Sequence, residues 1–228
     1  MTLTIAIDGP SGSGKSSVSR AVARELGVGY LDTGAMYRAL TWWCVQTGVD
    51  LSDQEAVAHA ARDLPLEMGT DPAAPSISVA GESVDAAIRT TEVSSVVSTV
   101  ATNLDVRAEL RRRQRDLMAR LAADTGGVVA EGRDITTVVA PDADVRILLT
   151  ASEEARLRRR STELHGEASA PTIEATRDQI VRRDREDSTV SVFTEAADGV
   201  VLVDTSDLDF DQSVQAVLAV VAAARESE

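Results

Sequence analysis

Short apolar runs alternate with amphipathic segments along most of the chain. The runs are typical of strands that are buried on both faces of a parallel sheet. We expect such strands at residues 3–7, from Tyr30, and at residues 128–130, 145–149 and 200–203. The segments between them repeat their apolar residues at helical spacing. The clearest apolar stripe is formed by Val18, Ala21, Val22 and Leu26.

This periodicity predicts helices at residues 16–26, 35–46, 53–62, 154–164, 172–185 and 211–224. Between residues 91 and 122 the same pattern is interrupted near residues 103–105, which predicts two helices there. Residues 64–88 instead alternate polar and apolar positions between glycine and proline turns, which is typical of a small antiparallel sheet of two or three strands. Strands that alternate with helices predict an α/β fold, with a parallel sheet covered by helices on both faces.

The first apolar run leads directly into a glycine-rich loop. The pattern G-x-x-x-x-G-K-[ST] is matched by Gly9, Pro10, Ser11, Gly12, Ser13, Gly14, Lys15 and Ser16, and Ser17 follows it. In such a loop the backbone amides and the N-terminus of the next helix bind nucleotide phosphates. Lys15 is expected to reach the β- and γ-phosphates, and the Ser16 hydroxyl is expected to bind Mg²⁺. The alternative is a chance turn rich in glycine and serine, against which the flanking strand and helix argue.

The charge balance and the cysteine content exclude several classes of protein. The 228 residues include 37 acidic side chains against 23 lysines and arginines, so the formal net charge is −14. This disfavours a non-specific nucleic-acid-binding protein, because phosphate backbones require a basic face. Cys44 is the only cysteine, which excludes an internal disulfide and a cysteine-based metal site. The N-terminal apolar run is too short for a signal peptide or a membrane span, so we expect a cytoplasmic protein that binds no membrane.

The chain contains a single lysine, Lys15 in the phosphate loop. The Asn-Lys-x-Asp motif with which GTPases read guanine therefore cannot occur. A mechanical or nucleic-acid ATPase would need an apolar strand that ends in Asp-Glu. Asp204 does follow the apolar run at residues 200–203, but the next residue is Thr205 and not a glutamate. These exclusions favour a small-molecule kinase that has a phosphate loop for ATP and arginines for a second, anionic substrate.

Six segments, in order along the chain, resemble the bacterial cytidylate kinase family. They are DGPSGSGKS at residues 8–16, LDTGAMYR at 31–38, IRTTEV at 88–93, VRAELRRRQR at 106–115, EGRDITTVVAPDADV at 131–145 and RDREDS at 183–188. The resemblance implies a three-layer P-loop fold that transfers the γ-phosphoryl group of ATP to CMP or dCMP, with Mg²⁺ as the cofactor. It also implies one kinase domain over residues 1–228, with an acceptor-binding insert at 64–100 and a helical lid at 152–188, and it suggests a monomer.

The resemblance implies that one pair of residues binds the phosphate of the acceptor and that a second pair binds its base. Arg38 and Arg133 are expected to bind the phosphate of CMP, because planar guanidinium groups suit bidentate contacts with it. Asp134 and Arg107 are expected to read the base. A carboxylate accepts a hydrogen bond from the N4 amine of cytosine, whereas it would repel the carbonyl oxygen of uracil.

The same resemblance assigns further roles. The hydroxyls of Thr33 and Ser98 are expected beside the base, Asp187 at the ribose, and Arg183 near the transferring phosphoryl group. The expected catalytic residues are Lys15, Arg133 and Arg183. A general base is not required, because the phosphate of a nucleoside monophosphate is largely dianionic at neutral pH.

Arg156 and Arg160 lie four residues apart, so they share one face of the predicted lid helix. We expect them to bind the phosphates of ATP when the lid closes over the site and excludes water. The equally open alternative is that they form ion pairs with Glu153, Glu154 and Glu163.

The chain departs from the family pattern at two positions. Val190 stands where the family has an arginine that contacts the acceptor phosphate, and our hypothesis is that Arg182 or Arg185 substitutes for it. Thr136 stands where glycine is usual, which predicts a slightly changed loop around Asp134. A solvated helix face is expected for Arg111, Arg112, Arg113 and Arg115.

Two alternatives to a cytidylate kinase stay open. Another phosphoryl acceptor, such as uridylate, adenylate or a sugar acid, could use the same core. Asp134 and Arg107 argue against it, because they favour a pyrimidine that bears an amine. The other alternative is a regulator that senses nucleotides without turnover. The altered segment at Val190 favours it, and the presence of Lys15 and Arg133 argues against it.

Overall fold

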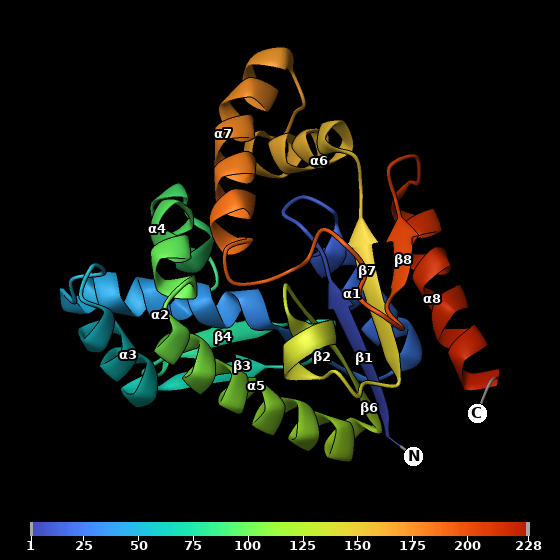
Figure 1. The fold of residues 1–228 in the computed structure, drawn as a ribbon, viewed down its shortest axis with the longest axis horizontal. Coiled ribbons are helices and arrows are strands. Elements are labelled where there is room, and N and C mark those ends of the chain that lie inside the picture. The colour runs from blue at the N-terminus through green and yellow to red at the C-terminus, as the bar shows by residue number, and fades with distance from the viewer. Residues whose placement is uncertain (1, 227–228) are drawn as a thin grey trace.

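Five parallel strands form the central sheet of the computed structural model, which describes residues 2–226 (Figure 1). From edge to edge their order is β2 (Gly29–Asp32), β6 (Gly127–Gly132), β1 (Leu3–Asp8), β7 (Val145–Thr150) and β8 (Val201–Asp204). The register places Ala6 of β1 opposite Ala130 of β6 and Arg146 of β7. Each strand predicted for the parallel sheet is therefore confirmed.

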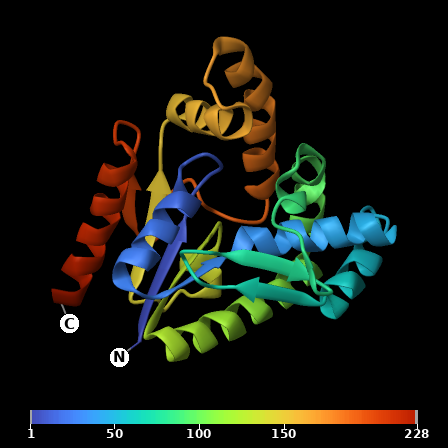
Figure 2. The same ribbon diagram turned by 180° about the vertical axis from the view of Figure 1, so that it is seen from behind.

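Helices cover both faces of this sheet. They are α1 (Lys15–Leu26), α5 (Leu104–Thr125) and α8 (Phe210–Glu226). On one face α1 and α8 pack with Ile5 and Ile7, and Figure 2 shows α1 in front of the strands. On the other face α5 and the π-helical turn Ile135–Val139 pack with Ala6. Successive residues of β1 thus enter two different apolar cores, which confirms the expected three-layer arrangement.

A second sheet of three antiparallel strands confirms the insert predicted at residues 64–88. Its strands are β3 (Leu66–Gly69), β4 (Ser76–Val79) and β5 (Glu82–Ser83). A third apolar core joins this sheet to α2 (Thr33–Thr47), α3 (Gln54–Asp63) and α4 (Thr91–Ala101). The predicted break between α4 and α5 lies at Asn103, whose side chain accepts hydrogen bonds from the amides of Asp105 and Val106 and caps α5.

Two helices stand above the carboxyl ends of the parallel strands (Figure 1). They are α6 (Glu153–His165) and α7 (Ala170–Asp187). α7 begins earlier than predicted because Pro171 lies in its first turn, where no amide hydrogen is needed. Residues 188–200, called the strap below, run from α7 to β8 beneath these helices (Figure 1). Within residues 2–226, no helix has the length and apolar character required to cross a membrane.

Candidate active site

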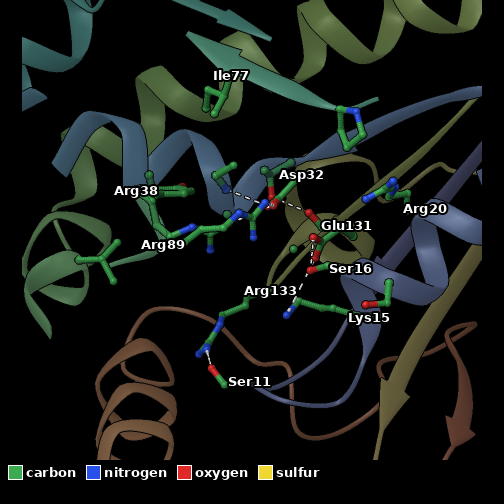
Figure 3. A pocket seen from close by; sticks show the side chains of 18 of the residues that line it. Ser11, Lys15, Ser16, Arg20, Asp32, Arg38, Ile77, Arg89, Glu131 and Arg133 are labelled. Atoms are coloured by element: carbon green, nitrogen blue, oxygen red, sulfur yellow. Dashed lines mark hydrogen bonds and ion pairs between the residues drawn. The ribbon is translucent and has the colours of Figure 1, made fainter. Parts of the chain in front are cut away.

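A cavity of about 650 Å³ lies at the carboxyl ends of the parallel strands, between the phosphate loop, the insert and the lid helices. Crevices at this end of a parallel sheet are where α/β proteins bind ligands. Side chains that are far apart in the sequence converge on the cavity (Figure 3). They include Lys15 of α1, Arg38 of α2, Arg133 after β6 and Arg183 of α7.

The phosphate loop turns sharply between β1 and α1. Gly12 and Gly14 have φ angles of +76° and +88°, a region that glycine adopts without strain. Gly14 caps α1, so the N-terminus of this helix opens toward the cavity. The loop residues that line the cavity are Ser11, Gly12, Gly14, Lys15, Ser16 and Ser17. Gly9, Pro10 and Ser13 belong to the turn itself and are not among the lining residues.

The ammonium group of Lys15 lies 3.9 Å from Glu131 Oε2 at the end of β6. Burial lowers the pKa of Lys15 from its ordinary value, the Glu131 carboxylate opposes this effect, and the charges of Arg133 and Arg183 add to it. The cavity therefore holds the positively charged side chains of Lys15, Arg133 and Arg183 in surroundings with little solvent. An anionic ligand among them would relieve their mutual repulsion.

Glu131 is a candidate site residue that the sequence analysis missed. It is buried, and its Oε1 accepts a hydrogen bond from the Ser16 hydroxyl at 2.6 Å. Burial raises the pKa of Glu131 to about 7, the Asp32 carboxylate raises it as well, and Lys15 lowers it. A signal was present in the sequence, because the apolar run at residues 128–130 ends in this acid.

Ser16 and Glu131 fit the expected magnesium site. The Ser16 hydroxyl and the Glu131 carboxylate are oxygen donors of the kind that Mg²⁺ prefers, and they already lie in hydrogen-bond contact. Among the side chains that the structure describes, no group of three or more histidine, cysteine and acidic residues is placed to hold a metal ion.

Asp32 orients Arg38 at the start of α2. Its Oδ1 accepts from the Ala35 amide at 2.8 Å and caps the helix, while its Oδ2 accepts from Arg38 Nη2 at 2.9 Å. A second guanidinium, that of Arg89, lies 3.8 Å from the same Oδ2 and was also missed from the sequence. Burial opposes ionisation of Asp32, but Arg38 and the helix cap outweigh it and hold the pKa of Asp32 below its ordinary value.

Arg133 contacts the phosphate loop, the lid and the strap. Its Nη2 donates to Ser11 Oγ at 2.5 Å and to Asp184 Oδ1 at 2.9 Å. Its Nη1 lies 2.8 Å from Asp187 Oδ2. The ring of Phe193 covers the guanidinium, with 4.4 Å between the ring centroid and Arg133 Cζ. Arg133 therefore lies beside the phosphate loop and lines the cavity. Its expected roles, in binding the acceptor phosphate and in catalysis, both require a position of this kind.

Arg183 points into the same cavity from α7. Its Nε lies 3.6 Å from Asp187 Oδ2. Burial and the charges of Arg133 and Arg38 together lower the pKa of Arg183 to about 9. Arg183 is still a cation at neutral pH, and it would gain from a bound phosphate.

The carboxylate of Asp184 joins the lid to the phosphate loop, and the sequence analysis missed it. Its Oδ1 accepts from the Ser11 amide at 3.1 Å, and its Oδ2 accepts from Arg156 Nη1 at 2.6 Å. Amides of such loops favour anions, so Asp184 lies where phosphate oxygens are also favoured. Arg156 Nη1 also donates to the Ser11 carbonyl oxygen at 3.0 Å, and its expected binding of ATP stays a prediction. Arg160 lines the cavity and pairs with Glu163 at 2.8 Å, which is one of the ion pairs considered as the alternative.

Asp134 lies between two guanidinium groups on another wall of the cavity. Its Oδ2 accepts from Arg107 Nη2 at 2.7 Å, and from Nε and Nη2 of Arg111 at 3.1 and 2.9 Å. Arg107 also donates to Ser191 Oγ at 2.6 Å. The prediction of a solvated Arg111 is wrong, because Arg111 follows Arg107 by one helical turn and shares its face.

Of the two residues whose hydroxyls are expected beside the base, Thr33 lines the cavity and Ser98 does not. Thr33 lines the cavity, and its hydroxyl donates to the Glu131 carbonyl oxygen at 2.8 Å. Ser98 is buried on α4 and is not one of the residues that line the cavity. The lining residues of that helix are Ser94, Val97 and Ala101.

Two more arginines of α5 bind backbone carbonyls. Arg113 Nη1 donates to the Leu64 carbonyl oxygen at 2.7 Å, and Arg115 Nε donates to that of Val139 at 2.9 Å. The prediction of a solvated side chain is therefore wrong for Arg113, whose side chain is 20% exposed, whereas Arg115 is exposed as predicted and also fixes α5 to a neighbouring segment. Arg112 is solvated as predicted, with 60% of its side chain exposed.

Thr136 binds Asp8, the last residue of β1. Its hydroxyl and its amide donate to Asp8 Oδ2 at 2.6 and 2.8 Å, and the Ile135 amide donates to Oδ1 at 2.9 Å. Among the described residues, Ala80 is the one non-glycine residue with a positive φ, so Thr136 fits its loop without that strain. Burial raises the pKa of Asp8 to about 6, and the hydrogen bonds from Thr136 and Ile135 oppose this.

The substitute proposed for the arginine missing at Val190 is not supported. Arg182 and Arg185 are both exposed, and neither lines the cavity. Arg182 instead donates to the Ser95 carbonyl oxygen at 3.3 Å and pairs with Glu186 at 3.4 Å. The side chains of α7 that do reach the cavity are Ile180, Arg183 and Asp187.

The phosphate loop, the buried cations around it and the carboxylate on the opposite wall define a P-loop phosphotransferase with an anionic second substrate. The chain belongs to the cytidylate kinase family, because the family model described as cytidylate kinase matches residues 5–223.

Individual relatives agree with this assignment. The cytidylate kinase of Streptomyces griseus is 49% identical over 221 residues, which cover 96% of this chain and 93% of that protein. The cytidylate kinase of Rhodococcus opacus is 48% identical over 221 residues, which cover 96% and 95% of the two chains. Among solved structures, a gluconokinase from Sinorhizobium meliloti has a TM-score of 0.51 at 17% identity, covering 99% of this chain and 95% of that one. That likeness shows the fold alone.

Proposed function

We propose that this kinase transfers the γ-phosphoryl group of ATP to CMP, producing ADP and CDP, and that it also accepts dCMP. The observation that carries the proposal is the carboxylate of Asp134, which Arg107 and Arg111 hold in the cavity that contains Lys15. This carboxylate can accept a hydrogen bond from the N4 amine of cytosine. Uracil would place a second acceptor against it, which disfavours UMP.

The remaining acceptor contacts follow from the charges of the cavity. Arg38 and Arg133 offer planar donors to the dianionic phosphate of CMP. In this proposal Lys15 and Arg183 neutralise charge on the transferring phosphoryl group. Positioning with charge neutralisation supplies most of the catalysis in such reactions. In this proposal Asp187 accepts a hydrogen bond from a ribose hydroxyl. The attacking oxygen needs no general base, because the phosphate is already largely dianionic.

ATP would bind through the amides of the phosphate loop and the N-terminus of α1. Ser16 and Glu131 would hold Mg²⁺, which when bound offsets the charge of the β- and γ-phosphate oxygens. The phosphates would compete with Asp184 for Arg156 and the Ser11 amide. Binding of ATP would thus break the contacts of Asp184 with the Ser11 amide and with Arg156, and Arg156 would become free to bind the phosphates of ATP.

We assign acceptor binding to the insert at residues 64–100 and closure to the lid at residues 152–188. Both segments line the cavity, and the lid contacts the phosphate loop through Asp184 and Arg156. The monomeric state, the cytoplasmic location and the absence of nucleic-acid binding stay predictions.

A coupled assay of ADP formation tests the proposed function. ATP and Mg²⁺ are supplied with CMP, dCMP, UMP, AMP or no acceptor. We expect fast turnover with CMP and dCMP and slow turnover with the others. Faster turnover with UMP or AMP would overturn the assignment of the base. Tight ATP binding without turnover on any acceptor would favour a nucleotide-sensing regulator.

A further inference from the structure

The strap presents alternate side chains to the active site. Ser191 and Phe193 are 8% and 1% exposed, whereas Val192 between them is 65% exposed. This is the alternation of an extended segment with one face against the protein. Ser191 accepts a hydrogen bond from Arg107, and Phe193 covers Arg133. The strap therefore contacts one arginine of the expected base site and one of the expected phosphate site.

Phe193 is among the largest fully buried side chains of the protein. Across the described residues, however, it belongs to none of the three apolar cores. Its ring contacts a cation, the guanidinium of Arg133. A large ring buried over a functional cation, and outside the cores, indicates a role at that cation.

The chemistry of the contact suits an arginine that must bind phosphate. A guanidinium presents its N–H donors at its edge, while an aromatic ring attracts it through its face. The edge of Arg133 carries the contacts with Ser11, Asp184 and Asp187. Phe193 thus contacts the guanidinium without using any of its donors and without adding a charge.

Several cations already lie close together in this cavity. Lys15, Arg133 and Arg183 already lie close enough for their charges to lower the pKa values of Lys15 and Arg183. An aromatic ring stabilises the positive charge of Arg133 without adding another cation.

We propose that Phe193 is a positioning residue that holds the guanidinium of Arg133 in the orientation that binds the acceptor phosphate. The inference rests on the proposed function and deepens it. It predicts that the ring of Phe193 affects binding of CMP and leaves binding of ATP nearly unchanged.

The test compares Phe193→Leu and Phe193→Met, which keep apolar bulk without a ring, with Phe193→Tyr, which keeps the ring. Val192→Ala is the matched control on the exposed side of the strap. KM and kcat are measured for CMP and for ATP, and urea unfolding gives the stability of each variant. We expect the ring-free variants to raise the KM for CMP about tenfold, with the KM for ATP within about twofold. Phe193→Tyr should recover most of the affinity for CMP.

A wild-type KM for CMP in the ring-free variants would overturn the inference, and so would equal losses for CMP and ATP in all three Phe193 variants. If the ring-free variants do not fold, Phe193→Tyr and Phe193→Trp are compared with wild type in equilibrium CMP binding, each with and without Arg133→Gln. If Phe193 acts by positioning Arg133, a substitution of the ring should change the affinity for CMP in the wild-type background and leave it unchanged in the Arg133→Gln variant. If the two substitutions instead lower the affinity for CMP additively, the inference is refuted. Failure of the proposed function is distinct, because wild type and Val192→Ala would then fail to phosphorylate CMP.

Discussion

Replacing Glu131 with glutamine is expected to change the pH dependence of stability and to impair phosphoryl transfer. Burial raises the pKa of Glu131 from 4.5 to about 7 in the folded protein. The folded state therefore binds this proton more tightly than the unfolded state does. Below pH 4.5 the carboxyl is protonated in both states and its burial costs little. Stability is lost as the pH rises from 4.5 to 7, and the full cost is present above pH 7.

The size of the effect follows from these two values. The interval between 4.5 and about 7 corresponds to roughly 3 kcal/mol, at about 1.36 kcal/mol for each pKa unit. Glutamine keeps the shape of the side chain and cannot ionise. The free energy of unfolding of the Glu131→Gln variant, minus that of wild type, should therefore increase by roughly 2.5 kcal/mol between pH 5 and pH 8.

Urea unfolding without nucleotide or Mg²⁺ measures this difference, and Asp8, whose pKa is also raised, affects both proteins equally. The same variant should lose about 10- to 100-fold in kcat, because the support of Ser16 and of the proposed magnesium site is removed. Parallel stability curves across this pH range would refute the electrostatic account of Glu131. An unchanged kcat would refute its place in the active site.

Further predictions concern Lys15 and the base site. Lys15→Arg should abolish turnover and leave the thermal midpoint within a few degrees, because a guanidinium cannot reproduce the compact ammonium charge in the phosphate loop; thermal unfolding and the coupled assay check this. Asp134→Asn should lower kcat/KM for CMP about 100-fold and narrow the preference for CMP over UMP, since its amide can donate to uracil; a preserved preference would argue against Asp134. Arg111→Gln should lower kcat/KM for CMP about tenfold, because Asp134 loses a charged partner, whereas the exposed control Arg112→Gln should match wild type.

Much of the fold could be predicted, because strands and helices follow from local periodicity. The runs that became β1, β6 and β7 are apolar and short, as strands buried on both faces must be. The break at Asn103 was visible because asparagine favours helix N-termini. The start of α7 was placed too late, since a proline in the first turn resembles a helix breaker when only its neighbours in sequence are considered.

The site was predictable where its residues form one continuous motif, and it was missed where contacts join distant segments. The phosphate loop was complete in the sequence. The contact of Asp184 with Ser11 spans 173 residues, and that of Arg111 with Asp134 spans 23. Charge patterning on a helix does not reveal which arginine faces a distant carboxylate, so Arg111 looked the same as the solvated Arg112.

Phosphorus NMR of wild-type enzyme mixed with ATP, Mg²⁺ and CMP tests the central claim most directly. The account predicts that the γ-phosphate signal of ATP disappears while signals of ADP and CDP grow in equal amounts. Release of inorganic phosphate without CDP would contradict it, because the acceptor would then be water. An unchanged ATP signal would contradict it as well, because the protein would bind nucleotides without transferring the phosphoryl group.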